Sequence, residues 1–199
     1  MTILVKVCGF RSEAQVKAAI DAGVDAVGFV FARSVREIAP ADAAVIRANM
    51  PSHVRRIAVM RHPTDDEWRE VLQVFSPDVL QTEAEDFALL NVPDSVEHWP
   101  VYRQGGAEPN AEGPYVFEGQ KSGHGETVDW SHAARLAESG QMILAGGLAP
   151  HNVAEAIATV RPFGVDVSSG IESAPGQKDG HLISEFVSAV RAAEKELEQ

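Results

Sequence analysis

The single thiol of this 199-residue chain, Cys8, is the first residue whose position suggests chemistry. It ends a short apolar run rich in β-branched residues, and Lys6 stands two residues before it, on the same face of a strand. A cation beside a cysteine favours the thiolate, which is the reactive form. The alternative is a small buried hydrophobic residue, because free cysteines are often buried. The residue types leave both interpretations open.

Two turns in the last quarter of the chain have the composition of a phosphate site. Gly146-Gly147 and Ser168-Ser169-Gly170 each follow a short apolar run. Glycine lets backbone N–H groups approach a ligand closely, and the second turn precedes an expected short extra helix, whose N-terminus would favour an anion. Together the turns predict an anion site, although each alone would equally suit a tight turn without a ligand.

Three charged residues stand near the same strand ends. Arg36 follows the second apolar run, Asp166 lies within the last one, and Asp129 precedes an amphipathic stretch. Asp129 is also a good helix N-cap, since aspartate accepts hydrogen bonds from the first backbone N–H groups. Arg36 could equally be a solvated surface charge. The residue types alone therefore do not show whether these three candidates have a functional role.

Metal and nucleotide sites find little support. The seven histidines are scattered and form no i, i+4 pair. His124-Gly125-Glu126 matches half of a zinc deaminase signature, but a chain with one cysteine lacks the cysteine pair. The chain also has neither GxGxxG nor GxxxxGK[ST], so dinucleotide and P-loop sites are not expected.

Short apolar runs alternate with amphipathic stretches along the chain. The runs predict strands at residues 3–7, 24–31, 54–60, 79–81, 96–102, 115–117, 142–145 and 165–167. The intervening stretches predict helices at 12–22, 40–50, 64–75, 83–90, 129–139, 150–160 and 182–197. Capping-box patterns at Ser12–Gln15 and Thr64–Glu67 mark two helix starts, and Gly23 suits a helix end.

Eight strands, most of them followed by a helix, predict parallel strands with right-handed crossovers and hence a small (β/α)8 TIM barrel. No linker divides the chain, so we expect one domain over residues 1–199. About 25 residues per unit is the lower limit for this fold. Residues 105–113 are rich in glycine where a fifth helix would stand, so that helix is expected to be reduced or missing. An open doubly wound sheet is the rival architecture.

Composition narrows the possible partners. The chain has 17 Lys and Arg against 29 Asp and Glu, a net charge of −12. Nucleic acid and anionic membranes need a basic footprint, so neither is an expected partner, whereas a small anionic ligand senses only its local site. One cysteine excludes a disulfide scaffold and suits a reducing cytoplasm. The apolar start is too short for a signal peptide. We expect a cytoplasmic protein, and a monomer.

Several short blocks, taken in order, carry a family resemblance. They are Lys6-Val7-Cys8-Gly9, Gly28-Phe29-Val30-Phe31, Ser34-Val35-Arg36, Asp129-Trp130, Leu144-Ala145-Gly146-Gly147-Leu148 with Asn152-Val153, and Val165-Asp166-Val167-Ser168-Ser169-Gly170-Ile171-Glu172 with Pro175-Gly176 and Lys178-Asp179. Together they resemble the phosphoribosylanthranilate isomerase family, over nearly the whole chain. The resemblance implies a small (β/α)8 barrel, often with a reduced fifth helix, that acts in tryptophan biosynthesis.

The implied reaction is an Amadori rearrangement of N-(5-phosphoribosyl)anthranilate to 1-(2-carboxyphenylamino)-1-deoxyribulose 5-phosphate. By motif position, Cys8 resembles the general base that removes the C2 proton, and Asp129 the general acid that protonates the ring oxygen. Arg36 resembles the ligand of the anthranilate carboxylate, and Asp166 a substrate partner. The two glycine and serine turns would hold the phosphate of this small phosphosugar. Acid–base chemistry of this kind needs no metal or other cofactor.

Three departures from the family pattern leave alternatives open. Val35 replaces the usual proline, Glu83 stands where Gln-Leu-His-Gly has histidine, and Glu126 replaces a lysine before the proposed acid. The two glutamates predict a more acidic mouth, with weaker substrate affinity or loop closure. One alternative is therefore a barrel that binds phosphate ligands without catalysis. Another is the aminoaldose isomerase of histidine biosynthesis, or a bifunctional form, although that family is longer and has aspartate in place of Cys8.

Overall fold

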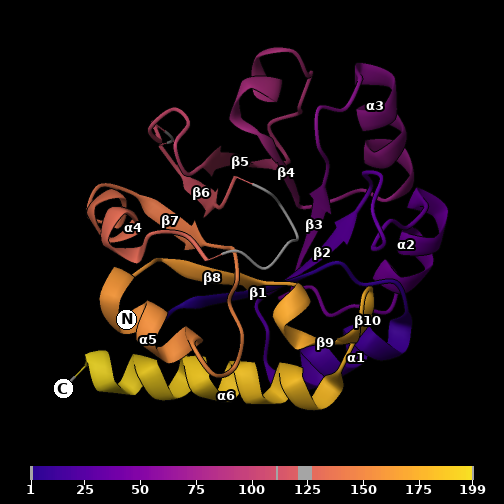
Figure 1. The fold of residues 1–199 in the computed structure, drawn as a ribbon. Helices are drawn as coiled ribbons and strands as arrows, with labels where there is room; N and C mark the ends of the chain where they lie inside the picture. Colours follow the sequence, from indigo (N-terminus) through magenta and orange to yellow (C-terminus); the bar gives the residue numbers. More distant parts are fainter. Residues whose placement is uncertain (1, 111, 121–126, 199) are drawn as a thin grey trace.

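The structure, a computed structural model, describes residues 2–110, 112–120 and 127–198. Eight parallel strands pair in chain order, and the last pairs with the first, so the sheet closes into a barrel (Figure 1). The strands are β1 (Leu4–Cys8), β2 (Ala26–Val30), β3 (Arg55–Val59), β4 (Val79–Glu83), β5 (Glu97–Arg103), β6 (Pro114–Glu118), β7 (Gln141–Leu144) and β8 (Gly164–Val167). The predicted barrel is confirmed, and its closure excludes an open sheet.

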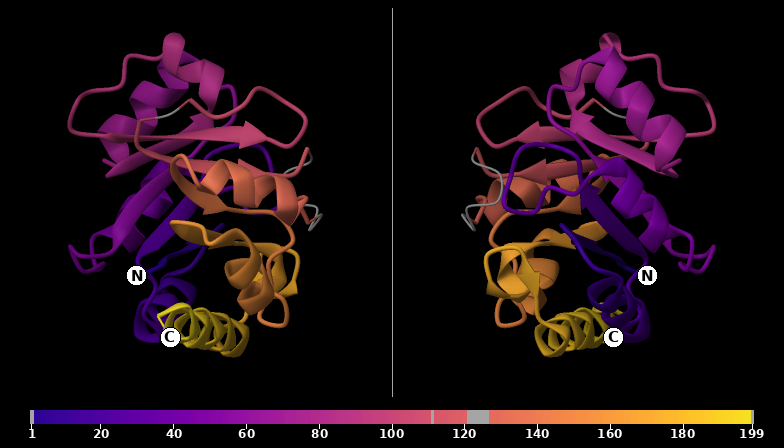
Figure 2. Two further views of the ribbon diagram at one scale, coloured as in Figure 1. Left: turned by 90° about the vertical axis from the view of Figure 1, so that its left-hand side faces the viewer. Right: turned by 90° about the vertical axis from the view of Figure 1, so that its right-hand side faces the viewer.

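Helices surround the barrel on all sides but one (Figures 1 and 2). They are α1 (Glu13–Ala22), α2 (Pro40–Arg47), α3 (Asp65–Val74), α4 (Trp130–Ala137), α5 (Val153–Val160) and α6 (Gly180–Leu197). A 3₁₀ helix, η1 (Ala84–Ala88), follows β4, and the described residues between β5 and β6 contain no helix. The expected loss of the fifth helix is thus confirmed. No helix in the described ranges is long and apolar enough to cross a membrane.

Local capping explains why two helices begin and end as predicted. The side chain of Ser12 accepts a hydrogen bond from the backbone N–H of Gln15, and Gly23 ends α1 with a left-handed φ of 90°. At the start of α3, Thr64 and Glu67 make both halves of a capping box. These contacts satisfy N–H groups that a helix end leaves without partners, so the sequence pattern and the structure agree.

Two other helix starts differ from the prediction. Helix α5 begins at Val153 and not at Pro150, because Asn152 first closes a turn, accepting from the Ala149 N–H at 2.8 Å and donating to the Gly147 carbonyl at 2.9 Å. Helix α6 begins at Gly180 and not at residue 182, because the Asp179 carboxylate caps it. Side-chain caps therefore override the starts that proline and hydrophobic periodicity indicate.

The apolar core has two layers, one outside and one inside the barrel. The outer layer lies between strands and helices and holds most of the buried hydrophobic residues. The inner layer fills the barrel and consists of Ala26, Ile57, Val79, Trp99, Val101, Val116, Ile143 and Ala145. Lys6 and Asp166 are buried beside these residues. Because the interior is filled, ligands have access only at the rim where the strands end.

One element was not predicted. Between β8 and α6 the chain forms a 3₁₀ turn, η2 (Ser169–Ile171), and an antiparallel hairpin of β9 (Glu172–Ala174) and β10 (Gln177–Lys178). The short extra helix was expected after Ser168-Ser169-Gly170, but the 3₁₀ turn includes Ser169 and Gly170, and the hairpin follows it. Strands of three and two residues are too short to show an alternating pattern of polar and apolar residues. The one trace of the hairpin in the sequence is its turn glycine, Gly176, which has a φ of 78°.

Candidate active site

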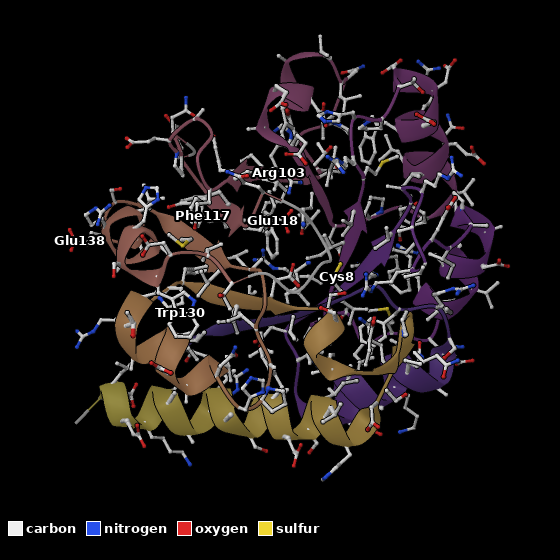
Figure 3. All side chains as sticks on the ribbon, in the orientation of Figure 1. Cys8, Arg103, Phe117, Glu118, Trp130 and Glu138 are labelled. Atoms are coloured by element: carbon white, nitrogen blue, oxygen red, sulfur yellow. The ribbon has the colours of Figure 1, made fainter. Side chains whose placement is uncertain are left out.

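One cavity opens where the eight strands end, and every strand or the loop after it contributes to the lining. The lining residues are Cys8, Val30, Ala32, Arg33, Ser34, Arg36, Val59, Met60, Arg61, Gln81, Glu83, Val101, Arg103, Glu118, Gly119, Ala145, Gly146, Gly147, Leu148, Asp166, Ser168 and Ser169. Figure 3 shows Cys8 and Glu118 directed toward the middle of the barrel mouth, with Arg103 beside Glu118. This is the rim at which barrel enzymes place their chemistry.

Seven of the nine predicted site residues meet in this cavity, namely Cys8, Arg36, Gly146, Gly147, Asp166, Ser168 and Ser169. Residues up to 160 positions apart in the chain become neighbours, because β1 pairs with β8 and closes the barrel. Gly170 and Asp129 do not line the cavity. Their assigned roles therefore remain predictions that need other support.

Cys8 lies at the end of β1 with 8% of its surface exposed. Its Sγ sits over Gly28 of β2, where an added Cβ would come within 3.0 Å of the sulfur. Burial raises the pKa of the thiol above its ordinary value, and Asp166 adds to this, while Lys6 and Lys178 act in the opposite direction. Burial therefore works against the thiolate of Cys8, while the two cations stand where they stabilise it.

Lys6 and Asp166 form a buried ion pair below the thiol, with Nζ of Lys6 2.5 Å from Oδ2 of Asp166. Burial lowers the pKa of Lys6, but the adjacent carboxylate outweighs this effect and raises the pKa overall. The other oxygen of Asp166, Oδ1, is buried and has no hydrogen-bond partner in the described structure, and the same is true of Oε1 of Gln81. Both residues line the cavity, so each brings an acceptor oxygen without a partner close to it.

The turns after β7 and β8 form one continuous wall. Gly146 and Gly147 have φ values of 93° and 63°, in the left-handed region that favours glycine. Asn152 holds this turn through the Gly147 carbonyl at 2.9 Å. On the adjacent turn, Oγ of Ser168 donates to the carbonyl oxygen of Cys8 at 3.0 Å. Small residues, whose backbone a ligand can approach closely, thus border the cavity.

Gly170 acts through packing. It lies behind the cavity wall, where an added Cβ would collide with the carbonyl oxygen of Leu148 and come within 3.0 Å of Ala149. The two turns interlock at this point, so only glycine allows the turn after β8 to approach the turn after β7.

Gly170→Ala is expected to lower stability by about 1–3 kcal/mol, because the turns must move apart to admit a methyl group. The measurement is thermal unfolding, in which a chain of this size loses roughly 2–4 °C per kcal/mol. Gly113→Ala is the matched control, since an added Cβ there meets nothing within 4 Å. An unchanged melting temperature in Gly170→Ala would contradict the interlocking role.

Arg36 is held in the cavity wall by Glu172 of β9. Its Nε and Nη2 donate to the two carboxylate oxygens at 2.7 and 2.9 Å. Burial alone would raise the pKa of Glu172, but hydrogen bonds from Arg36 and Lys178 lower it to about 2. The arginine side chain passes over Gly9, where a Cβ would lie 2.6 Å from Cδ of Arg36. The guanidinium is therefore fixed directly above the residue that follows Cys8.

Asp129 is the N-cap of α4, the simpler of the two roles considered above. Its Oδ1 accepts from the backbone N–H groups of Ser131 and His132 at 2.9 and 3.2 Å, and its own N–H donates to Gln104. Its side chain is exposed. Trp130, the next residue, lies toward α5 and away from Cys8 in Figure 3. A catalytic role for Asp129 would therefore require the start of α4 to approach a bound ligand.

The comparison with protein families shows which family the chain belongs to. The family model PRAI, described as N-(5'phosphoribosyl)anthranilate (PRA) isomerase, matches residues 5–189. The chain belongs to the phosphoribosylanthranilate isomerase family. A curated relative, the N-(5'-phosphoribosyl)anthranilate isomerase of Stenotrophomonas maltophilia strain R551-3, is 37% identical over 206 residues, which cover 96% of this chain and 94% of the relative.

Solved structures of phosphoribosylanthranilate isomerases share the fold. TrpF from Jonesia denitrificans is similar with a TM-score of 0.81 and 32% identity, covering 97% of this chain and 98% of that chain. A phosphoribosylanthranilate isomerase in complex with reduced 1-(o-carboxyphenylamino)-1-deoxyribulose 5-phosphate has a TM-score of 0.78 and 26% identity, covering 96% of this chain and all of the other.

Glu83, one departure from the usual phosphoribosylanthranilate isomerase pattern, is neutralised by arginine. Nε of Arg103 lies 3.1 and 3.0 Å from its two oxygens, and Nε of Arg61 lies 3.9 Å from Oε1. Arg103 also pairs with Glu118 at 2.6 Å. Glu83 is therefore paired with arginine at the mouth, and its effect on substrate affinity stays a prediction. Glu126, the other acidic departure, lies outside the described residues.

The cavity is a local positive site on a protein of net charge −12. Four arginines line it (Arg33, Arg36, Arg61 and Arg103), against the three carboxylates of Glu83, Glu118 and Asp166. The anion affinity expected of a phosphoribosylanthranilate isomerase is thus compatible with the acidic surface, because a ligand in the cavity senses the nearest charges.

Two residues of the site escaped prediction because strand ends were misplaced by one position. Strands β5 and β6 were expected to end at residues 102 and 117, but they end at Arg103 and Glu118, and both residues reach the cavity. The rule that chemistry lies at strand ends would have found them. Among the described residues, no group of three histidine, cysteine, aspartate or glutamate side chains is arranged to hold a metal ion.

Proposed function

We propose that this protein converts N-(5-phosphoribosyl)anthranilate to 1-(2-carboxyphenylamino)-1-deoxyribulose 5-phosphate, as a step of tryptophan biosynthesis. The observation that carries the proposal is the shared cavity, which the only thiol of the chain lines together with Arg36 and the turns at Gly146 and Ser168, in a chain of this family. Rescue of growth in a tryptophan auxotroph that lacks this isomerase tests it. Rescue by the intact chain and none by Cys8→Ala is the expected result.

Cys8 is the general base in this proposal. The ring of the aminoaldose opens, the thiolate removes the C2 proton, and the enolamine that results tautomerises to the ketose. A base must come within hydrogen-bond reach of its proton. The position of Cys8 in the cavity lining, close to Lys6, Asp166 and the turn at Ser168, supports this role.

Asp129 is the general acid, which protonates the ring oxygen so that the ring can open. Its carboxylate lies outside the cavity, so we propose that the start of α4 moves toward bound substrate. Only Oδ1 serves as the helix cap. The N-cap role and the acid role therefore belong to different states of one residue, and substitutions can separate them.

The cavity walls match the two ends of the substrate. The phosphate would bind the backbone N–H groups at Gly146, Gly147, Ser168 and Ser169, with Gly170 keeping the two turns in contact. The anthranilate carboxylate would bind Arg36, whose position Glu172 fixes.

The sugar would lie between these ends. The unpaired oxygens of Asp166 and Gln81 would accept hydrogen bonds from its hydroxyl groups.

Arg36→Lys should raise KM for this substrate about tenfold with a smaller effect on kcat, since lysine cannot make the two parallel hydrogen bonds of a guanidinium. Steady-state kinetics measure the change. Arg135→Lys on the exposed face of α4 is the matched control. A KM equal to that of the unaltered chain would assign the carboxylate to another residue.

The remaining properties follow from the same proposal. The rearrangement moves protons only, so no metal or redox cofactor is required. We propose a monomer, because the exposed large hydrophobic residues, Val35, Val45, Val74 and Leu89, stand on four separate segments. Light scattering of the purified chain tests this. A cytoplasmic location would keep the Cys8 thiol reduced.

A further inference from the structure

A continuous chain of polar contacts runs from Arg36 to the backbone of Cys8. Arg36 donates to Glu172, and Nζ of Lys178 donates to Oε1 of the same carboxylate at 2.7 Å. The ammonium of Lys178 also donates to the carbonyl oxygen and Oγ of Ser168, at 2.9 and 3.1 Å. Oγ of Ser168 in turn donates to the carbonyl oxygen of Cys8. The β9–β10 hairpin thus connects a cavity-wall arginine to the end of β1.

This network is buried and carries an excess positive charge. The exposed fractions of the side chains are 0% for Lys178, 5% for Glu172 and 12% for Arg36. Three acceptors around Nζ of Lys178 are the environment of a protonated amine. Two cations share one carboxylate, which leaves a net charge of about +1, and a buried net charge is costly unless an anion forms nearby.

Most of the other charged groups around Cys8 are paired with a group of opposite sign. Lys6, the nearest cation on β1, is matched one to one by Asp166. On the wall formed by β3 to β6, Arg61 and Arg103 pair with Glu83 and Glu118, and Arg33 stands on the loop after β2. The excess charge linked directly to the end of β1 is therefore that of the hairpin network.

We propose that Lys178 is a positioning residue that stabilises the Cys8 thiolate, with Glu172 holding Lys178 and Arg36 in place together. The hairpin then serves both substrate binding and proton removal. Glu172 orients Arg36, which would bind the carboxylate of the substrate, and it also orients Lys178, the cation connected to Cys8. This inference rests on the proposed role of Cys8.

Alkylation by iodoacetamide tests the inference without catalysis. Since the chain has one cysteine, labelling of the full-length protein reports on Cys8 alone. In Lys178→Met the midpoint of the pH–rate profile for alkylation should rise by about one pH unit. Below the midpoint, this shift makes alkylation about tenfold slower. The same variant should lose kcat near neutral pH about tenfold and recover it at higher pH, with KM within about twofold.

Two further variants make the result specific. Lys178→Arg keeps the charge and should restore the midpoint. Lys17→Met, on the exposed face of α1, is the matched control and should leave it unchanged. If Lys178→Met does not fold, Lys178→Gln takes its place. A folded charge-removing variant whose midpoint stays within about 0.2 unit of the unaltered chain would overturn the inference.

The two proposals fail in different ways. Turnover that survives in Cys8→Ala would remove the proposed role of Cys8 as the base and leave the alkylation shift to decide whether Lys178 stabilises the thiolate. An inactive Cys8→Ala variant together with an unshifted midpoint in Lys178→Met would overturn only the role of Lys178.

Discussion

Cys8→Ala is expected to lower kcat by a factor of about 10³ or more, because it removes the base that takes the C2 proton. Steady-state turnover of purified protein measures the loss. The barrel should remain folded, since alanine removes a single sulfur atom at the rim and adds nothing that could clash with Gly28. A melting temperature close to that of the unaltered chain is the control. Full activity in the alanine variant would contradict the assignment of the base.

The pH dependence of the unaltered chain follows from the same thiol. Burial raises the pKa of Cys8, so the thiolate forms only as the pH rises through that elevated value. We therefore expect the rate of Cys8 alkylation to increase with pH and to level off above the ordinary thiol pKa of about 8.5. A plateau that begins below that value would show that the cations outweigh burial.

Asp129→Asn is expected to lower kcat by about 10²–10⁴-fold while leaving the fold intact, because asparagine caps helices as well as aspartate does but cannot deliver a proton. Kinetics and thermal unfolding should be measured on the same sample. Asp129→Ala, which removes both roles, should in addition lose about 1 kcal/mol of stability.

The pair of variants distinguishes a catalytic acid from a helix cap. If Asp129→Asn keeps full turnover and only Asp129→Ala is impaired, the residue is a cap alone. The acid would then have to be another group, and the carboxylates that line the cavity, Glu83, Glu118 and Asp166, are the ones to test.

The barrel was predictable because its signals are local. Strand runs and capping boxes act within a few residues, and Thr64 with Glu67 is an example in which pattern and contact agree. The β9–β10 hairpin was not predictable, because its strands are too short to show an alternating hydrophobic pattern and because it is stabilised by partners that are distant in the sequence. Gly176, for instance, packs where a Cβ would lie 2.7 Å from the carbonyl oxygen of Val35.

The site was predictable where a residue's role depends on a strand end, as for Cys8, Asp166 and the turn at Gly146. It was not predictable where a role depends on a side-chain contact between separate elements. The pairing of Glu83 with Arg103 joins two neighbouring strands, and the contact of Lys178 with Ser168 joins a hairpin to the cavity wall. Such contacts depend on the register of the strands and on the path of the hairpin, which no sequence interval records.

The most direct test is turnover of N-(5-phosphoribosyl)anthranilate by the purified chain, with Cys8→Ala assayed alongside and the aminoaldose of histidine biosynthesis as a second substrate. We predict conversion of the anthranilate compound by the unaltered chain, none by the variant, and none of the histidine-pathway compound. No conversion of the anthranilate compound by a folded, unaltered chain would contradict the proposed function and leave a phosphate-binding barrel without this activity.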